Sequence, residues 1–93
     1  MIRAHLLIRG RVQGVGYRAG VKRTANQLGL KGWVKNLPNG DVEAVVEGSE
    51  EMVDRLIQWC QRGPTSAHIT EVRVEKEEAT GEFHGFTIRR TWP

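Results

Sequence analysis

The sequence has few of the features that anchor a chain to a membrane or fix it by cross-links. It contains one cysteine, Cys60, so an intramolecular disulfide is excluded and we expect the reducing environment of the cytoplasm. No apolar run approaches the ~18 residues of a membrane-spanning helix, and residues 1–5 lack the apolar stretch of a signal peptide. With 93 residues, 39% of them hydrophobic and 27% charged, we expect a single globular domain over 1–93 that acts as a monomer away from membranes.

Acidic residues are missing from the first 40 positions. That segment carries eight lysines and arginines, whereas all 11 aspartates and glutamates follow it, and the net charge of +3 hides this asymmetry. A long segment without acids favours an anionic ligand. Nucleic acid, phosphate and acidic metabolites all satisfy that condition.

The pattern of apolar residues predicts alternating strands and helices. Period-two alternation indicates a strand, spacing of three and four indicates a helix, and Asn39-Gly40 is a strong hairpin signal. In chain order we expect a strand at 2–12, a helix through 21–28, strands at 33–37 and 42–47, a helix from Ser49 to Gly63, and strands at 69–77 and 86–88. This order predicts an α+β, ferredoxin-like fold: an antiparallel sheet of four core strands plus a short terminal strand, with two helices on one face.

A glycine-rich loop, Gln13-Gly14-Val15-Gly16-Tyr17-Arg18, joins the first strand directly to a helix. Glycines at 14 and 16 allow the positive φ values that turn consecutive amides into one hollow at the positive end of the helix dipole. Arg18 at the end of the loop can grip two phosphate oxygens. The loop therefore predicts a phosphate cradle; the alternative is a tight turn with a solvent-exposed arginine.

Two other phosphate-binding motifs do not fit this loop. A dinucleotide fingerprint requires an acidic residue ~20 positions further on, where this sequence has Lys35 and Asn36. A P-loop requires a Gly-Lys-Ser/Thr ending, which is missing.

Asn36 is the second candidate functional residue. In a ferredoxin-like fold the first two strands are parallel, so their carboxyl ends share one edge of the sheet. The glycine-rich loop follows the first strand and Asn36 lies near the end of the second. Its carboxamide can hold a water molecule by donating and accepting hydrogen bonds. The alternative is that Asn36 only shapes the hairpin that follows.

Two blocks of this sequence resemble the signature of the acylphosphatases. They are Gly10 to Arg18, GRVQGVGYR, and Gly32 to Glu43, GWVKNLPNGDVE. The resemblance implies hydrolysis of the carboxyl-phosphate bond of acyl phosphates, with inorganic phosphate or sulfate as competing anions. It implies that Arg18 and the loop amides bind the phosphoryl group, that Asn36 orients the attacking water, and that neither a metal nor a covalent intermediate is used. The substrate-binding residues are then Gln13, Gly14, Val15, Gly16, Tyr17 and Arg18.

The sequence departs from the family in two places. Tyr17 stands where the family more often has phenylalanine, so its hydroxyl needs a partner. Ala19-Gly20 are small where many members carry bulkier residues, which affects the rim of the pocket and the choice of substrate.

The remaining reactive side chains point to no further chemistry. The three histidines lack metal-ligand spacing, so we expect no metal and no cofactor, and Cys60 falls on the apolar stripe of the second helix. The other class of function that fits is a non-catalytic anion-binding module, for an acyl or carbamoyl phosphate or for RNA. We do not expect nucleic acid, because the first strand offers no aromatic side chain for base stacking.

Overall fold

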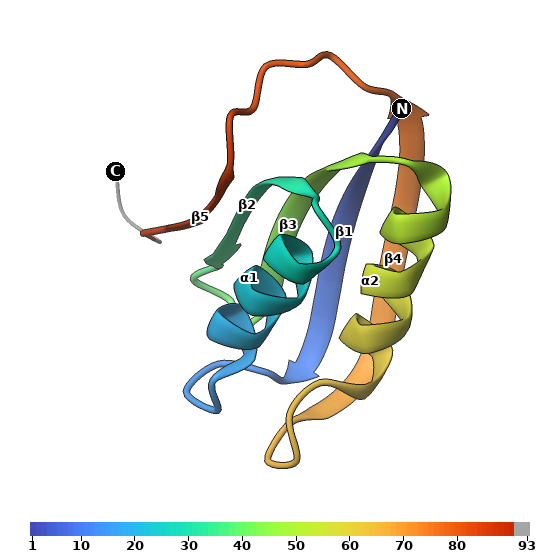
Figure 1. Ribbon diagram of the computed structural model, residues 1–93. Helices are drawn as coiled ribbons and strands as arrows, with labels where there is room; N and C mark the ends of the chain where they lie inside the picture. The colour runs from blue at the N-terminus through green and yellow to red at the C-terminus, as the bar shows by residue number, and fades with distance from the viewer. Residues whose placement is uncertain (91–93) are drawn as a thin grey trace.

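The chain folds into a five-stranded sheet covered on one side by two helices (Figure 1). The computed structural model describes residues 1–90. Its elements in chain order are β1 (Ile2–Arg11), α1 (Tyr17–Gln27), β2 (Lys31–Asn36), β3 (Val42–Gly48), α2 (Glu50–Arg62), β4 (His68–Glu78) and β5 (Phe86–Arg89). The predicted order of strands and helices, and with it the ferredoxin-like α+β fold, is confirmed.

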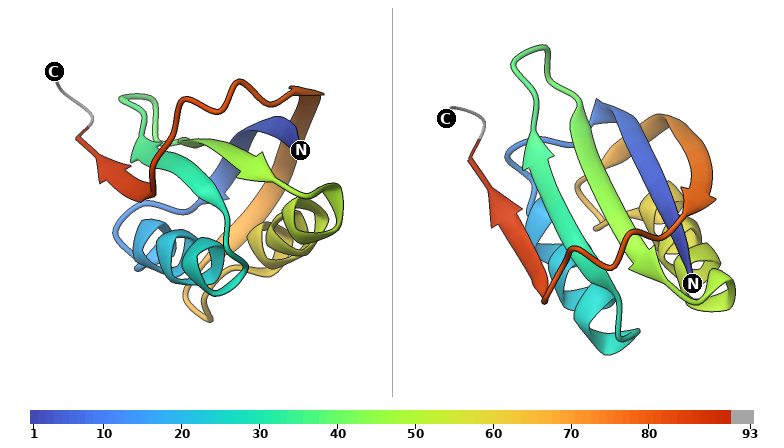
Figure 2. Two further views of the ribbon diagram at one scale, coloured as in Figure 1. Left: turned by 45° about the horizontal axis from the view of Figure 1, so that its top comes forward. Right: turned by 90° about the horizontal axis from the view of Figure 1, so that it is seen from above.

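The sheet has the order β4-β1-β3-β2-β5. The four core strands pair antiparallel, as predicted, whereas β5 runs parallel to β2. The chain must therefore cross from one edge of the sheet to the other, and residues 79–85 do so over the face that the helices leave open (Figure 2). The expectation of an antiparallel sheet thus holds for the core, and the crossover explains why the terminal strand differs.

Alternation along the strands separates a buried face from an open one. Ala4, Leu6 and Ile8 of β1 are fully buried against the helices, and their neighbours on β3 are equally buried. Val74 of β4 pairs with Leu6 and so lies on this same face, as predicted, but it remains 37% exposed. The reason is its position on an edge strand, which has a neighbour on one side only.

The two helices begin in different ways. In α2 the Ser49 hydroxyl accepts a hydrogen bond from the Met52 amide (3.4 Å), which is the N-cap that the sequence predicted. In α1 the N-cap is Gly16, which has no side chain to satisfy the first amides. Within residues 1–90, neither helix combines the length and apolarity that crossing a membrane requires.

Basic and acidic side chains on the open face pair across the strands. The pairs join basic residues of the first 40 positions to acidic residues that follow them: Arg3 with Glu47, His5 and Lys35 with Glu43, and Arg9 with Asp41. These contacts neutralise part of the positive charge that the sequence concentrates near the N-terminus. Part of the charge asymmetry is therefore used in contacts between strands of the sheet.

Glu47 holds the crossover against the sheet. Its buried carboxylate accepts hydrogen bonds from Arg3 Nε (2.7 Å), the Thr80 amide (2.9 Å) and the Gly81 amide (3.0 Å). Burial alone would raise the pKa of Glu47, but these hydrogen bonds outweigh it and lower the pKa to about 2. The Arg3 guanidinium also lies 5.0 Å from the ring centroid of Phe83. The crossover is thus fixed at its start, which in turn positions β5.

Candidate functional site

The glycine-rich loop leaves β1 and enters α1 with two residues in the left-handed region. Gly14 has φ 77° and Gly16 has φ 80°, as the sequence predicted. A Cβ built on either glycine would meet no atom within 4 Å. These positions therefore need glycine for its backbone conformation and not for space.

The start of α1 presents amides that the helix itself does not use. The Gly20 amide donates to the Gly16 carbonyl (3.1 Å), so it is the fifth amide counted from the N-cap residue. The amides of 16–19 precede the first turn of α-helical hydrogen bonds, and no side chain caps them. Together with the positive end of the helix dipole they form a site suited to an anion.

Arg18 lines a hollow of about 180 Å³ at this place. The wall consists of the loop and the start of α1, at positions 14 and 16–19, together with Val12 and Ile88. None of the ion pairs found among residues 1–90 involves Arg18. Arg18 is partly buried and lines the same hollow as the residues that begin α1, so the structure brings Arg18, Gly14, Gly16 and Tyr17 together around one space.

The side chain of Tyr17 points into the core and not into the cradle. Its hydroxyl donates to the Cys60 carbonyl (2.7 Å), and its ring lies 5.5 Å from that of Trp59. Burial raises the pKa of Tyr17 above its usual value and raises the pKa of the Cys60 thiol to about 12. The tyrosine hydroxyl has therefore found its partner, and Tyr17 can meet a ligand only through its backbone.

Gln13 and Val15 also use their side chains for structure. Gln13 Nε2 donates to the carbonyls of Leu37 (2.7 Å) and Asp41 (2.8 Å), which ties the loop to the hairpin after β2. Val15 packs against the hydrophobic core. These connections were not evident from the sequence, because both residues lie inside a motif that reads as a ligand site. In the proposed mode of binding, each would contact a ligand through its backbone amide.

Asn36 is the last residue of β2 and lies beside the hairpin that Gln13 holds. Asn36 pairs with Val42, which pairs in turn with Ile8 of β1, so Asn36 is on the helix-covered face. It lies at the end of the sheet where β1 leads into the glycine-rich loop. Its Oδ1 atom is buried and has no hydrogen-bond partner within residues 1–90. A buried acceptor without a partner is costly, so the Asn36 carboxamide is not held by structural hydrogen bonds through this oxygen. Asn36 does not itself line the hollow around Arg18.

Ile88 and Val12 line the hollow but were not among the predicted site residues. The alternation in Phe86-Thr87-Ile88 indicated a strand, but nothing in it showed which edge the strand joins. In the structure Ile88 pairs with Val34 and so faces the same side as the cradle.

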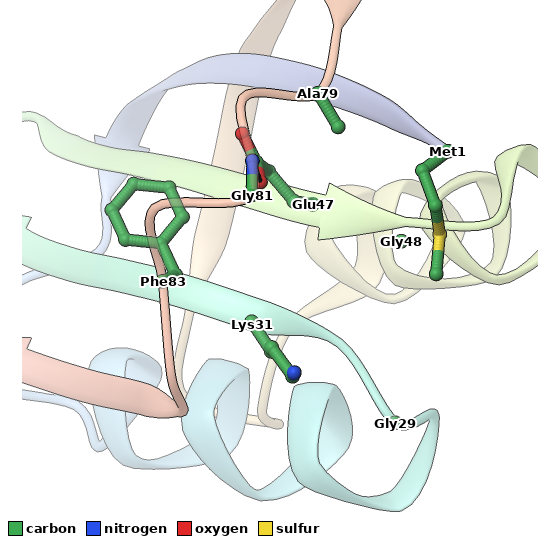
Figure 3. A pocket seen from close by; sticks show the side chains of 8 residues that line it. All are labelled: Met1, Gly29, Lys31, Glu47, Gly48, Ala79, Gly81 and Phe83. Atoms are coloured by element: carbon green, nitrogen blue, oxygen red, sulfur yellow. Dashed lines mark hydrogen bonds between the residues drawn. The ribbon is translucent and has the colours of Figure 1, made fainter.

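A second hollow, of about 150 Å³, lies at the opposite end of the sheet (Figure 3). Met1, Lys31 and Phe83 line it together with Glu47, whose side chain reaches from β3 toward Gly81. Both oxygens of that carboxylate already hold the crossover, at Thr80 and Gly81. Neither oxygen of Glu47 is therefore without a partner at this hollow. Within residues 1–90 no three His, Cys, Asp or Glu side chains gather as metal ligands would.

Comparison with known proteins gives a consistent result. The family model described as Acylphosphatase matches residues 4–88. The acylphosphatase of Aeropyrum pernix is 56% identical over 90 residues, which cover 96% of this chain and 89% of the relative. The acylphosphatase of Methylococcus capsulatus is 53% identical and the match covers 97% and 98% of the two chains. The crystal structure of acylphosphatase from Bacillus subtilis superposes with a TM-score of 0.93 at 32% identity, over 96% of this chain and 99% of that one.

Proposed function

The chain belongs to the acylphosphatase family and hydrolyses acyl phosphates, and from this premise we propose that Arg18, Asn36 and the amides of residues 14–18 carry the reaction. The observation that carries the proposal is the hollow in which Arg18 joins the unused amides at the start of α1. A phosphoryl group placed there receives hydrogen bonds on its oxygens from several directions. Arg18 adds the positive charge that balances them.

Asn36 positions the attacking water in this proposal. The carboxamide of Asn36, at the carboxyl end of β2, hydrogen-bonds the water, whose oxygen then attacks phosphorus in line with the leaving carboxylate. The bond between phosphorus and the acyl oxygen breaks, its electron pair leaves with the carboxylate, and the water proton passes to the substrate. An acyl phosphate is an activated anhydride, so orientation and charge stabilisation suffice without a general base. For the same reason we propose that the reaction needs no metal and no cofactor.

Hydrolysis of benzoyl phosphate in excess chelator tests the role of Arg18. We expect Arg18→Ala to lose ~10²–10³ in kcat/KM and to lose competitive inhibition by inorganic phosphate or sulfate. Arg23→Ala is the matched control, because Arg23 is an exposed arginine of the same helix that does not line the hollow. An Arg18 variant with normal turnover and normal phosphate inhibition would place the anion site elsewhere. A folded wild-type protein that binds phosphate but shows no metal-free turnover would contradict the mechanism.

The role of Asn36 is tested by separating turnover from binding. We expect Asn36→Ala to lower kcat by ~10²–10³ and to leave the inhibition constant of phosphate within about twofold. Asn39→Ala is the control, since Asn39 shapes the same hairpin by accepting a hydrogen bond from the Asp41 amide (3.0 Å). If the two variants lose activity to the same extent, Asn36 acts by shaping the hairpin and the water role is wrong.

We propose further that the protein works as a monomer in the cytoplasm. The support for the cytoplasm is the low cysteine content: the chain has one cysteine, Cys60, and it is buried in the core. Light scattering at micromolar concentration measures the mass directly.

A further inference from the structure

One wall of the cradle comes from β5, which is far from the glycine-rich loop in the sequence. Ile88 pairs with Val34, a fully buried residue on the helix-covered face, so its side chain is on that face too. It nevertheless stays 41% exposed and lines the hollow beside Arg18 and Ala19. An apolar side chain of this size, open to solvent at the rim of an anion site, is available to a ligand.

The position of Ile88 is fixed by the fold. The strand that carries it begins with Phe86, which is buried, and the Gly32 amide of β2 donates to the Gly85 carbonyl (2.9 Å) just before it. Upstream, Glu47 anchors the crossover through the amides of Thr80 and Gly81. Both the crossover before β5 and the first residue of β5 are thereby held in place. The position of Ile88 in the wall of the hollow is fixed as a result.

The groups that line the hollow are of two kinds, hydrogen-bond donors and apolar side chains. Its hydrogen-bond donors are the backbone of the loop and the guanidinium of Arg18, and these face the phosphoryl oxygens in the proposed mode of binding. The apolar wall consists of Val12, Ala19 and Ile88, of which Val12 is only 1% exposed. Ala19 and Ile88 are exposed and so remain free to touch the part of the substrate that lies outside the donors.

We propose that Ile88, together with the small Ala19, contacts the acyl group of the substrate and selects apolar and aromatic acyl phosphates over smaller or charged ones. The proposal rests on the proposed function, since the phosphoryl group must sit at Arg18 for the acyl group to reach β5. Ala19 leaves room beside Arg18, and the isoleucine provides the surface that a ring or alkyl chain covers. Covering apolar surface on both partners favours such substrates.

The test compares kcat/KM for benzoyl phosphate and acetyl phosphate in the wild type, Ile88→Ala and Ile88→Val. We expect Ile88→Ala to lower the benzoyl-to-acetyl ratio about tenfold, while Ile88→Val retains most of it. The inhibition constant of inorganic phosphate should stay unchanged, because the donors are intact. Val74→Ala is the matched control: Val74 is an exposed apolar residue on the same face at the opposite edge of the sheet.

Two different outcomes would overturn the proposal that Ile88 contacts the acyl group. If the ratio is unchanged in Ile88→Ala while phosphate still competes with substrate, the acyl group does not lie over Ile88 and the proposed function stands. If phosphate does not compete even in the wild type, the cradle is not the substrate site and both proposals fail. Thermal unfolding of each variant separates either result from loss of the fold.

Discussion

Gly16 and Gly29 pose the same backbone requirement at the two ends of α1. Their φ values are 80° and 70°, and a Cβ on either would meet no atom within 4 Å. They differ in what lies beside them, because Gly16 lines the hollow at the start of the helix and Gly29 follows its end. The pair therefore offers a way to separate backbone strain from the geometry of the cradle.

We expect Gly16→Ala and Gly29→Ala to lower the free energy of unfolding by similar amounts, about 1–2 kcal/mol each. Only Gly16→Ala should also lower kcat/KM, by about tenfold to a hundredfold, since relaxation of the strained backbone would turn away the amides that we propose bind the phosphoryl oxygens. Urea denaturation and benzoyl phosphate hydrolysis measure the two effects. Equal activity in the two variants would show that the left-handed turn at Gly16 is not needed to hold the amides.

Residue types in the loop support the proposed phosphate site, but they did not give the direction of each side chain. The glycines and Arg18 were interpretable because positive φ and a guanidinium beside amides each have a direct physical meaning. The side chains of Gln13 and Tyr17 were not, because their partners are carbonyls 24 or more positions away in the chain. Only the packed structure brings those carbonyls to the loop.

At the scale of elements, the Tyr17 hydroxyl supplies a hydrogen bond that the backbone at the end of α2 cannot make. The carbonyl of Cys60 would accept a hydrogen bond from the residue four positions on, but that residue is Pro64, which has no amide hydrogen. The Tyr17 hydroxyl of α1 donates instead, at 2.7 Å. The contact fixes the start of α1, where the cradle lies, to the C-terminal turn of the neighbouring helix.

Removing that hydroxyl should affect stability and not catalysis. We expect Tyr17→Phe to lower the free energy of unfolding by about 1–3 kcal/mol, because a buried carbonyl is left without a donor. The ring keeps its place against Trp59, so kcat/KM should change less than twofold. Urea unfolding followed by circular dichroism measures the first and the benzoyl phosphate assay the second. A variant as stable as the wild type would show that the Cys60 carbonyl has another donor.

The elements that could be predicted from the sequence are those with local signals. The strand and helix order followed from periodicity, from the Ser49 cap and from the turn at Asn39-Gly40. The direction of β5 was not predictable, since four residues carry no information on which strand they join. That choice depends on Glu47 and the crossover, whose contacts span more than 30 positions. The wall at Ile88 was missed for the same reason.

At the scale of the whole molecule, the two ends of the sheet carry different features. One end holds Arg18 and the loop, and the other holds Glu47 and the crossover that delivers β5 back toward the first. The carboxylate of Glu47 is ionised far below neutral pH, with a pKa of about 2. A group whose pKa is lowered by folding contributes stability that is complete above its unfolded pKa, about 4.3, and is lost as the pH falls toward 2.

This dependence predicts how a variant of Glu47 will behave. At pH 7 we expect Glu47→Gln to be less stable than the wild type by about 1.5–3 kcal/mol, because the amide replaces an ionised acceptor of several hydrogen bonds. The difference should narrow as the pH falls from about 5 toward 2, since the wild-type carboxylate then becomes neutral as well. Urea unfolding across that range measures the gap between the two proteins. Glu43→Gln, on the same strand and paired with His5 and Lys35, is the control. A gap for Glu47→Gln that stays constant down to pH 2 would mean that its charge does not hold the crossover.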